Sequence, residues 1–303
     1  MDTAQDRDKR FGTANRIITI GFWINAILMA MKLLAGYFGK SEAVFADGIE
    51  SGCDFVAIIA TLIALKVGCK SVDHEHPYGH GKAECIAAIF VSLIILAAGG
   101  GILYKAIAIF ISGDYHEPQL IAVAAAFATI LVKEVLFHYT HRIAVVLESP
   151  AVDAIAKDHR KDALTSVSTL IGVTGAYFGI VFLDPLAAAL TSFFIFYIGI
   201  TTLKKCCHDL MDGRPPQEIL TQISSTAEEI TGVARVHEIR GRRSGQYLII
   251  DLKLEMDPDL TVKQSHDIAT NVKILIFNRF ANVGDVMIHI NPSDEEHEDL
   301  IRL

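Results

Sequence analysis

Ala46-Asp47-Gly48-Ile49-Glu50-Ser51-Gly52-Cys53-Asp54 places three acids inside an apolar run that extends from Ala43 to Leu65. That run is long enough to cross a bilayer, for which about 20 residues are needed. A carboxylate within a membrane span costs roughly 2.5 to 3.5 kcal/mol on insertion scales. An acid at such a depth therefore predicts a functional site.

The composition of the whole chain is that of a membrane protein. Of its 303 residues, 51% are hydrophobic and only 20% are charged. Six apolar runs are about as long as a bilayer is thick. These predicted spans are Ile17–Phe38, Ala43–Leu65, Ala83–Ile111, Pro118–Tyr139, Val152–Phe182 and Pro185–Leu203. We therefore predict an α-helical membrane protein with six transmembrane helices in residues 1–213.

Residues 214–303 lose this apolar character and are expected to form a small soluble domain. Gly213-Arg214-Pro215-Pro216 marks the boundary. Hydrophobic periodicity then predicts a helix, two strands joined at Ser244-Gly245, a second helix and a last strand. Their expected ranges are Gln217–Glu229, Ala234–Arg242, Tyr247–Glu255, Val262–Phe280 and Asp285–Ile290. This order is the αββαβ pattern of a metallochaperone-like domain, followed by an acidic tail at residues 294–299.

Basic residues predict the orientation in the membrane, since Lys and Arg gather on the cytoplasmic side. One side carries Arg7, Lys9, Arg10, Arg16, Lys66, Lys70, Lys82, Arg142, Lys204 and Lys205, whereas the other carries mainly Lys40. Both termini and the loop between the second and third spans are therefore expected in the cytoplasm. The polar first 16 residues are not followed by the short apolar region of a cleaved signal peptide.

Several function classes are excluded. A net charge of −8 does not suit a nucleic-acid binder. The five cysteines show no disulfide framework, which fits reduced thiols. The sequence contains no activated serine or cysteine site and no zincin motif. We therefore predict that the protein is not an enzyme and that it uses no cofactor.

Two pairs of acids have helical spacing. Glu50 and Asp54 are four residues apart, as are Asp158 and Asp162, so each pair lies on one face of its helix. A helix rises about 1.5 Å per residue, which places Glu50 and Asp158 roughly 12 Å from opposite membrane surfaces. Asp54 and Asp162 then lie roughly 18 Å from those same surfaces. In a core about 30 Å thick, the two pairs are then level with each other.

Four carboxylates at one level cannot all remain ionised and unpaired, so a divalent cation or protons must neutralise them. Metal and protons compete for the same oxygens, which couples metal release to proton uptake. We therefore predict a proton-driven metal antiporter. His159 lies one position off the shared face, so we expect it to support the ligands rather than bind. The alternative, that the acids cap helices or pair with Arg160 and Lys161, suits Asp47 but not the other four.

Other ionisable groups receive different interpretations. Lys32, in the first span, is expected to extend toward a membrane interface. Lys133 and Glu134, adjacent in the fourth span, are expected to neutralise each other. The loop residues Asp73, His76 and His80 have a ligand-like spacing, although loop histidines are common and the signal is weak alone.

Three motifs together resemble those of the cation diffusion facilitators, and the resemblance covers nearly the whole chain. They are Ala46-Asp47-Gly48-x-x-Ser51-x-x-Asp54, Asp73-x-x-His76-Pro77-Tyr78-Gly79-His80-Gly81-Lys82-x-Glu84, and Asp158-His159-Arg160-Lys161-Asp162-Ala163-Leu164-Thr165-Ser166. The resemblance implies homodimers in a membrane, here expected to be a bacterial inner membrane, that exchange divalent metal for protons by alternating access.

The resemblance also implies roles for individual residues. The transport site would be Glu50, Asp54, Asp158 and Asp162. A second, loop metal site of the iron and zinc branch would be Asp73, His76 and His80. Lys82 and Asp212 would form a charge pair that locks the dimer, and His237, His266 and His289 would bind metal in the cytoplasmic domain. Lys253 and Asn291 depart from the family pattern, where His and Asp are frequent, and this places the cytoplasmic site in doubt.

The donor set of the transport site bears on the choice of metal. Four carboxylates, in place of the histidine that zinc members carry, favour Mn²⁺ and then Fe²⁺ over Zn²⁺. The loop site points instead to the iron and zinc branch. Efflux of Zn²⁺ or Co²⁺ by the same mechanism, and a metal-sensing membrane scaffold that has lost transport, remain the alternatives.

Overall fold

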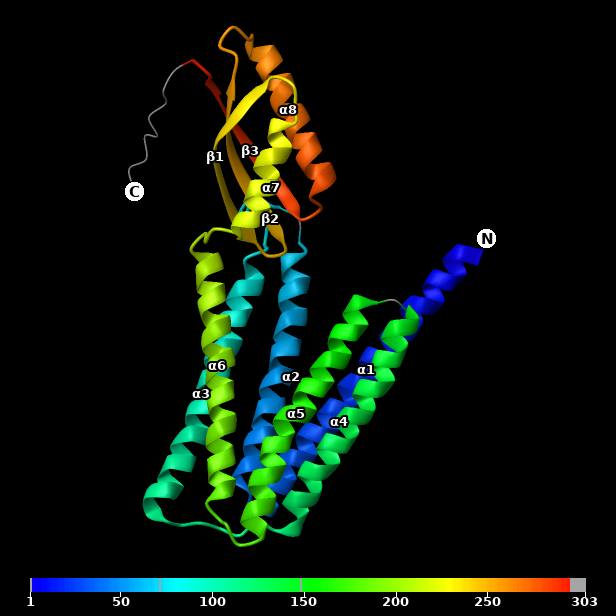
Figure 1. Cartoon of the computed structure of the whole chain (residues 1–303), viewed down its shortest axis with the longest axis vertical. Helices are drawn as coiled ribbons and strands as arrows, with labels where there is room; N and C mark the ends of the chain where they lie inside the picture. The colour runs from blue at the N-terminus through cyan, green and yellow to red at the C-terminus, as the bar shows by residue number, and fades with distance from the viewer. Residues whose placement is uncertain (1, 71, 148, 295–303) are drawn as a thin grey trace. The chain divides into compact units, whose positions relative to one another are not determined.

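The computed structural model describes residues 2–70, 72–147 and 149–294, so the predicted acidic tail lies almost wholly outside the described residues. The described residues contain six long helices (Figure 1). They are α1 (Asp2–Phe38), α2 (Glu42–Gly68), α3 (Ala83–Ser112), α4 (Leu120–Leu147), α5 (Pro150–Tyr177) and α6 (Leu183–Leu210). Each overlaps one predicted span, which confirms the helical membrane architecture.

Composition separates α5 from the other long helices. Residues 16–38 of α1, together with α2, α3, α4 and α6, are long and apolar enough to cross a membrane. At 28 residues α5 has the same length as α4 and α6, but its first half contains the charged run from Lys157 to Asp162. The predicted extension of this span to Phe182 is wrong, because the helix ends at Tyr177 and Gly179 adopts φ 100°.

Local sequence signals fix where the helices begin. The Ser149 hydroxyl accepts a hydrogen bond from the backbone N–H of Val152, and Pro150 occupies the first turn of α5, where its missing N–H costs nothing. The Ser41 hydroxyl accepts from the N–H of Val44 at the start of α2. These caps set the register of the two helices that carry the acid pairs.

The chain divides into two units, residues 1–59 with 91–201 and residues 60–90 with 202–303. In the first unit α4 and α5 lie side by side (Figure 1). A cluster of mostly small buried side chains packs its helices, namely Ala35, Val44, Ala122, Ala125, Ala126 and Val173. Small residues allow helix backbones to approach closely in a membrane. These two units differ from the predicted membrane domain (residues 1–213) and soluble domain (residues 214–303). The boundary between membrane and soluble domains stays a prediction.

The C-terminal residues of the second unit form the predicted αββαβ domain. Its elements are α7 (Gln217–Glu228), β1 (Val233–Ser244), β2 (Tyr247–Met256), α8 (Val262–Arg279) and β3 (Val283–Pro292). The sheet order is β1-β2-β3, with β1 antiparallel and β3 parallel to β2. The parallel pair follows from the crossover through α8, since a tight turn cannot join parallel strands.

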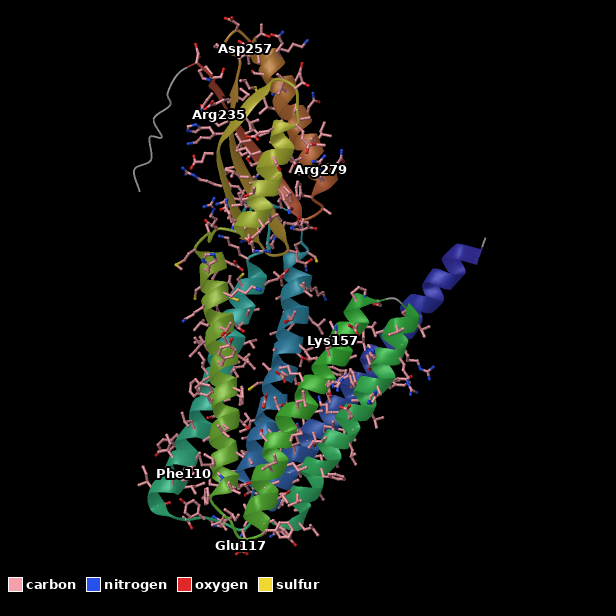
Figure 2. All side chains as sticks on the ribbon, viewed as in Figure 1. Phe110, Glu117, Lys157, Arg235, Asp257 and Arg279 are labelled. Atoms are coloured by element: carbon pink, nitrogen blue, oxygen red, sulfur yellow. The ribbon has the colours of Figure 1, made fainter. Side chains whose placement is uncertain are left out.

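Alternation along β2 decides which face of the sheet is covered. Leu248, Ile250, Leu252 and Leu254 are at most 1% exposed and pack in one cluster with residues of α7 and α8. The intervening positions, such as Asp251 and Lys253, therefore point to the other face. Charged side chains cover the surface of this domain, among them Arg235 and Arg279 (Figure 2). The thin core matches the small domain that the sequence predicts.

Candidate metal site

A cavity of about 370 Å³ lies among α1, α2, α4 and α5. Its acidic wall is made of Asp54 from α2 and of Asp158 and Asp162 from α5. The other lining residues are Ile18, Gly21, Phe22, Asn25, Leu28, Ser51, Phe55, Ile58, Lys133, Ile155 and His159. Three of the four predicted transport carboxylates thus open into one cavity.

The two α5 carboxylates differ in their surroundings. The Asp158 side chain is 68% exposed, and its carboxylate lies 3.9 Å from the ammonium of Lys161. The Asp162 side chain is 24% exposed. The i, i+4 spacing places both on one face of α5, as the sequence predicts. Asp158 is therefore the more accessible oxygen donor and Asp162 the more enclosed one.

Lys133 of α4 belongs to this cavity. Its ammonium lies 2.6 Å from Asp162 Oδ2, and its side chain is 5% exposed. The prediction that Lys133 and Glu134 neutralise each other is wrong, because adjacent residues on a helix do not face each other. Glu134 instead contacts His138, one turn further along α4. The sequence signal was a lysine within an apolar helix, and its partner is Asp162 rather than the adjacent Glu134.

Lys32 of α1 does not extend toward a membrane interface, so that prediction is also wrong. Its side chain is 2% exposed, and its ammonium donates to Asp47 Oδ1 at 2.9 Å and to Ser51 at 3.1 Å. The other oxygen of Asp47 accepts from the Ser166 hydroxyl at 3.1 Å. Asp47 therefore has the structural role that the sequence predicts, with Lys32 as its partner.

Glu50 stands between these two groups of residues. It is absent from the cavity wall, which Asp54 lines from the next turn of α2. Within the described ranges, the quartet does not bring three ligand atoms within 4.8 Å of one another. Asp54, Asp158 and Asp162 thus share the wall of one cavity without forming a compact cluster, and Glu50 lies one helical turn away from Asp54.

His159 lines the cavity from a buried position. Its side chain packs against Gly21 of α1, and its residue exposure is 4%. No group in the described part of the chain hydrogen-bonds its Nδ1. This placement fits a residue that supports the site, as the sequence predicts.

The loop residues Asp73, His76 and His80 do come together. Their ligand atoms lie within 4.8 Å of one another, and among described residues this is the one such group of three or more. Asp73 Oδ1 lies 3.2 Å from Nδ1 of His76, and Oδ2 lies 3.4 Å from Nε2 of His80. The backbone N–H of His76 lowers the pKa of Asp73, and both imidazoles add to this. Two imidazoles and an ionised carboxylate form a donor set that suits a transition metal.

The histidines predicted to bind metal in the cytoplasmic domain remain apart. Nδ1 of His237 lies 3.1 Å from Glu255, while His266 is exposed on α8. His289 is exposed on β3, and it pairs in register with Lys253 of β2. The ammonium of Lys253 contacts Glu238 at 2.6 Å, and Asn291 is buried. A lysine therefore stands beside the one histidine on the open face of β3.

Lys82 and Asp212 form an ion pair, and the family resemblance implies these two residues as a charge pair. Nζ of Lys82 lies 2.8 Å from Oδ1 of Asp212, and Arg242 contacts the other oxygen at 3.4 Å. The hydrogen bond from Lys82 is the main cause that lowers the pKa of Asp212. Asp212 sits at φ 57°, so the turn after α6 presents its side chain at some cost in backbone strain. Its role in a dimer stays a prediction.

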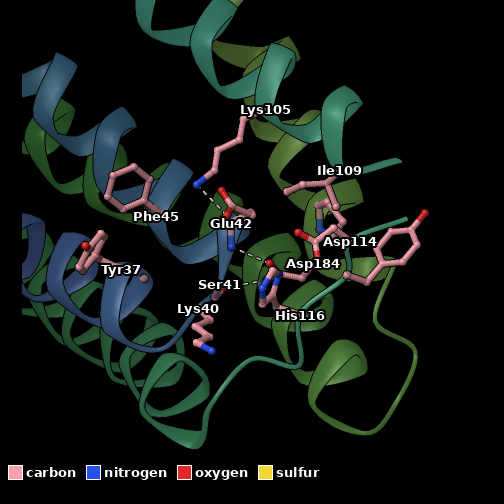
Figure 3. A pocket seen from close by; sticks show the side chains of 13 residues that line it. Tyr37, Lys40, Ser41, Glu42, Phe45, Lys105, Ile109, Asp114, His116 and Asp184 are labelled. Carbon is pink, nitrogen blue, oxygen red and sulfur yellow. Dashed lines mark hydrogen bonds and ion pairs between the residues drawn. The ribbon is translucent and has the colours of Figure 1, made fainter. Parts of the chain in front are cut away.

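A second cavity, of about 230 Å³, lies where α1 joins α2 (Figure 3). Buried Asp184 of α6 accepts hydrogen bonds from the Ser41 hydroxyl and from the N–H of Glu42, both at 2.6 Å. The side chain of Glu42 contacts Lys105 of α3 at 2.8 Å. These acids already have partners, so we assign them to holding the helix ends together.

Comparisons with known proteins agree with this architecture. Residues 18–211 match the family model described as the cation efflux transmembrane domain. The chain belongs to the cation efflux family. Residues 215–293 match the cytoplasmic domain of cation efflux proteins. Family members are transporters of the membrane, so this chain is an integral membrane protein of a transport family.

Three bacterial proteins are similar to nearly the full chain. The manganese efflux system protein MneP of Bacillus subtilis is 36% identical, over 93% of this chain and 97% of its own. MneS of the same organism is 30% identical, over 94% and 97%. Magnetosome protein MamM of Paramagnetospirillum magneticum is 30% identical, over 92% and 88%. A cadmium form of the MamM CTD is 23% identical, with a TM-score of 0.25, over 26% of this chain and 98% of that chain.

Proposed function

We propose that this chain exports Mn²⁺ or Fe²⁺ in exchange for protons, through a site made of Glu50, Asp54, Asp158 and Asp162. One observation carries the proposal. Carboxylates from α2 and α5 open into the same cavity, whose wall also includes residues of the long apolar helices α1 and α4. Intramembrane acids of this kind mark ion pathways, because their cost must be offset by a function.

The donor chemistry supports the choice of metal. Oxygen ligands suit Mn²⁺ and other hard divalent ions, whereas Zn²⁺ favours imidazole and thiolate. MneP and MneS, similar over nearly the whole chain, are named for manganese efflux. Among the described residues, His159 is the one imidazole in the cavity wall, and its burial against Gly21 suits a supporting role.

Coupling to protons follows from competition for the same oxygens. A carboxylate must lose its proton to bind a metal ion, so metal binding and proton binding exclude each other. A site that opens first to one side and then to the other would exchange the two. Asp47 takes no part, since Lys32 and Ser166 already occupy both of its oxygens.

The loop group of Asp73, His76 and His80 favours a second metal site. Its imidazoles suit Zn²⁺ or Fe²⁺ better than Mn²⁺. A metal bound there would act as a regulatory ligand rather than as cargo. If the transported ion were also Zn²⁺ or Co²⁺, both sites would share one metal, and this is the second candidate function.

We further propose that the protein works as a homodimer with both termini in the cytoplasm. The match to the cytoplasmic domain of cation efflux proteins supports this assembly. The orientation rests on the basic residues that flank the spans.

Transport in proteoliposomes tests the proposed function. Purified protein is reconstituted with an imposed pH gradient, and Mn²⁺, Fe²⁺, Zn²⁺ and Co²⁺ fluxes are measured separately and in competition. Loss of a supporting partner at a metal site already costs about 10- to 100-fold. We therefore expect Asp54→Ala and Asp162→Ala each to reduce flux by about 100-fold or more.

Glu117→Ala is the matched control, because this exposed carboxylate lies in the connection between α3 and α4, outside the cavity (Figure 2). Its flux should equal that of the parent. Metal-driven proton flux that survives in Asp54→Ala or Asp162→Ala would show that the site is elsewhere. Metal binding without flux in the parent protein would instead favour a metal-sensing scaffold.

A further inference from the structure

We propose that Lys133 is a tethered competitor of the transported metal. Its ammonium occupies Asp162 when no metal is bound, and it has to leave when the metal arrives. The inference rests on the proposed transport site. Its starting point is the contact of 2.6 Å between Nζ of Lys133 and Oδ2 of Asp162, both on the wall of one cavity.

Among the described residues, the ion-pair partner of Lys133 is Asp162. The side chain is 5% exposed, and an ammonium so deeply enclosed among helices is costly unless it is paired. The neighbouring acid on the same helix, Glu134, points to His138 instead. Lys133 thus neutralises Asp162 in a cavity that also contains the carboxylates of Asp54 and Asp158.

The contact can be broken more easily than a purely structural ion pair. Asp162 is 24% exposed and lines the cavity, so other protein groups leave part of its carboxylate uncovered. The lysine side chain is a flexible four-carbon stem with a compact charge, so it can withdraw without rebuilding a planar, bidentate contact. A metal ion that enters the cavity can therefore replace the Lys133 ammonium at Asp162.

A divalent ion and the ammonium cannot share the same carboxylate oxygen. Both are cations, and at hydrogen-bonding distances their repulsion in a partly dry cavity is strong. A metal ion that takes Oδ2 therefore displaces Lys133 from Asp162, and metal release allows it to return. Lys133 then lowers the affinity for the metal, speeds its release, and neutralises part of the empty site while the carrier returns.

The test compares Lys133→Met with the parent protein in two assays at one fixed pH. Calorimetric titration gives the Kd for Mn²⁺, and initial rates in proteoliposomes give KM and the maximal rate. We expect the variant to bind Mn²⁺ about tenfold more tightly, equivalent to about 1.4 kcal/mol. Its maximal rate should fall, because release slows. Lys133→Arg keeps the charge and should not tighten binding; its Kd should equal or exceed that of the parent, because a bidentate guanidinium is harder to displace.

A merely structural lysine would give a different result. Unchanged or weaker Mn²⁺ binding by a folded Lys133→Met, in a parent that transports Mn²⁺, would overturn the inference and leave the proposed function intact. If Lys133→Met fails to fold, Lys133→Gln takes its place. If Lys133→Met and Lys133→Gln both fail to fold while Lys133→Arg is stable, the inference is also overturned, since the charge would then serve only folding.

Two further measurements separate the possible failures. A parent protein without any metal flux would refute the proposed function, whatever Lys133 does. Lys105→Met is the control for loss of a lysine from a membrane helix, because Lys105 pairs with Glu42 at the other cavity and is 58% exposed. Its Kd for Mn²⁺ should not change.

Discussion

Two buried lysines pair with aspartates in the membrane helices, and they differ in what surrounds them. Lys32 and Asp47 are 2% and 5% exposed, and both also bind serine hydroxyls. Lys133 is just as buried, but its partner Asp162 is 24% exposed and faces a cavity that contains other carboxylates. The same two residue types therefore form a closed network in one place and an open contact in the other.

The difference separates a structural ion pair from an ion pair that belongs to the proposed transport site. In the closed network each charged group has its hydrogen bonds satisfied, so nothing is left to bind an ion. In the open contact the carboxylate keeps an accessible side, and an incoming cation can compete for it. Accessibility, rather than the presence of charge, distinguishes the carboxylates of the proposed transport site.

The largest expected effect comes from breaking the closed network. Lys32→Met leaves Asp47 buried without its cation, which should cost about 3–5 kcal/mol of unfolding free energy. Thermal unfolding of the detergent-solubilised protein measures this. The double variant Lys32→Met/Asp47→Leu should recover most of the loss, because an apolar pair leaves no buried charge. A Lys32→Met variant that is fully stable but inactive would assign this pair to transport.

Glu50 sharpens the comparison, because it lies one turn from Asp54 and near the Lys32 network. We expect Glu50→Gln to weaken Mn²⁺ binding about tenfold, in the range typical of groups that support a metal site. Titration calorimetry measures the change, and Glu134→Gln is the matched control, because the Glu134 carboxylate forms an ion pair with His138 and does not line the cavity. Equal affinities for parent and variant would place Glu50 with the structural network.

The smallest effect is expected at the exposed pair of Lys82 and Asp212, whose side chains are 41% and 44% exposed. Lys82→Ala should cost only about 0.2–1 kcal/mol, because solvent screens such pairs. Lys82 lowers the pKa of Asp212, so its contribution is present at neutral pH and disappears as the pH falls through the folded-state pKa. Melting temperatures of parent and variant should therefore converge in acid, and a constant difference would contradict this account.

Most of the candidate site was predictable because helical spacing is local. The placement of Glu50 with Asp54, and of Asp158 with Asp162, on one helix face follows from i, i+4 geometry, whereas the expected match in depth stays a prediction. The loop group was predictable from its His-x3-His spacing, and the structure brings it together. Whether these residues bind metal still depends on the experiments described above.

The partners of the lysines were not predictable in the same way. Lys32 reaches Asp47, 15 residues away, and Lys133 reaches Asp162, 29 residues away. The helical period gives the direction of a side chain on its own helix, but not the neighbour that this direction meets. Sequence reasoning therefore looked for a membrane interface for Lys32 and an adjacent acid for Lys133, and both were wrong.

By itself, the sequence determined the six helices, the αββαβ domain and the faces on which the acids lie, because apolar periodicity and caps act within a few residues. Only the tertiary structure decided which acids are closed off and which remain open to a cavity. That distinction depends on how α1, α2, α4 and α5 pack together, and side chains far apart in the sequence settle it through contact and burial.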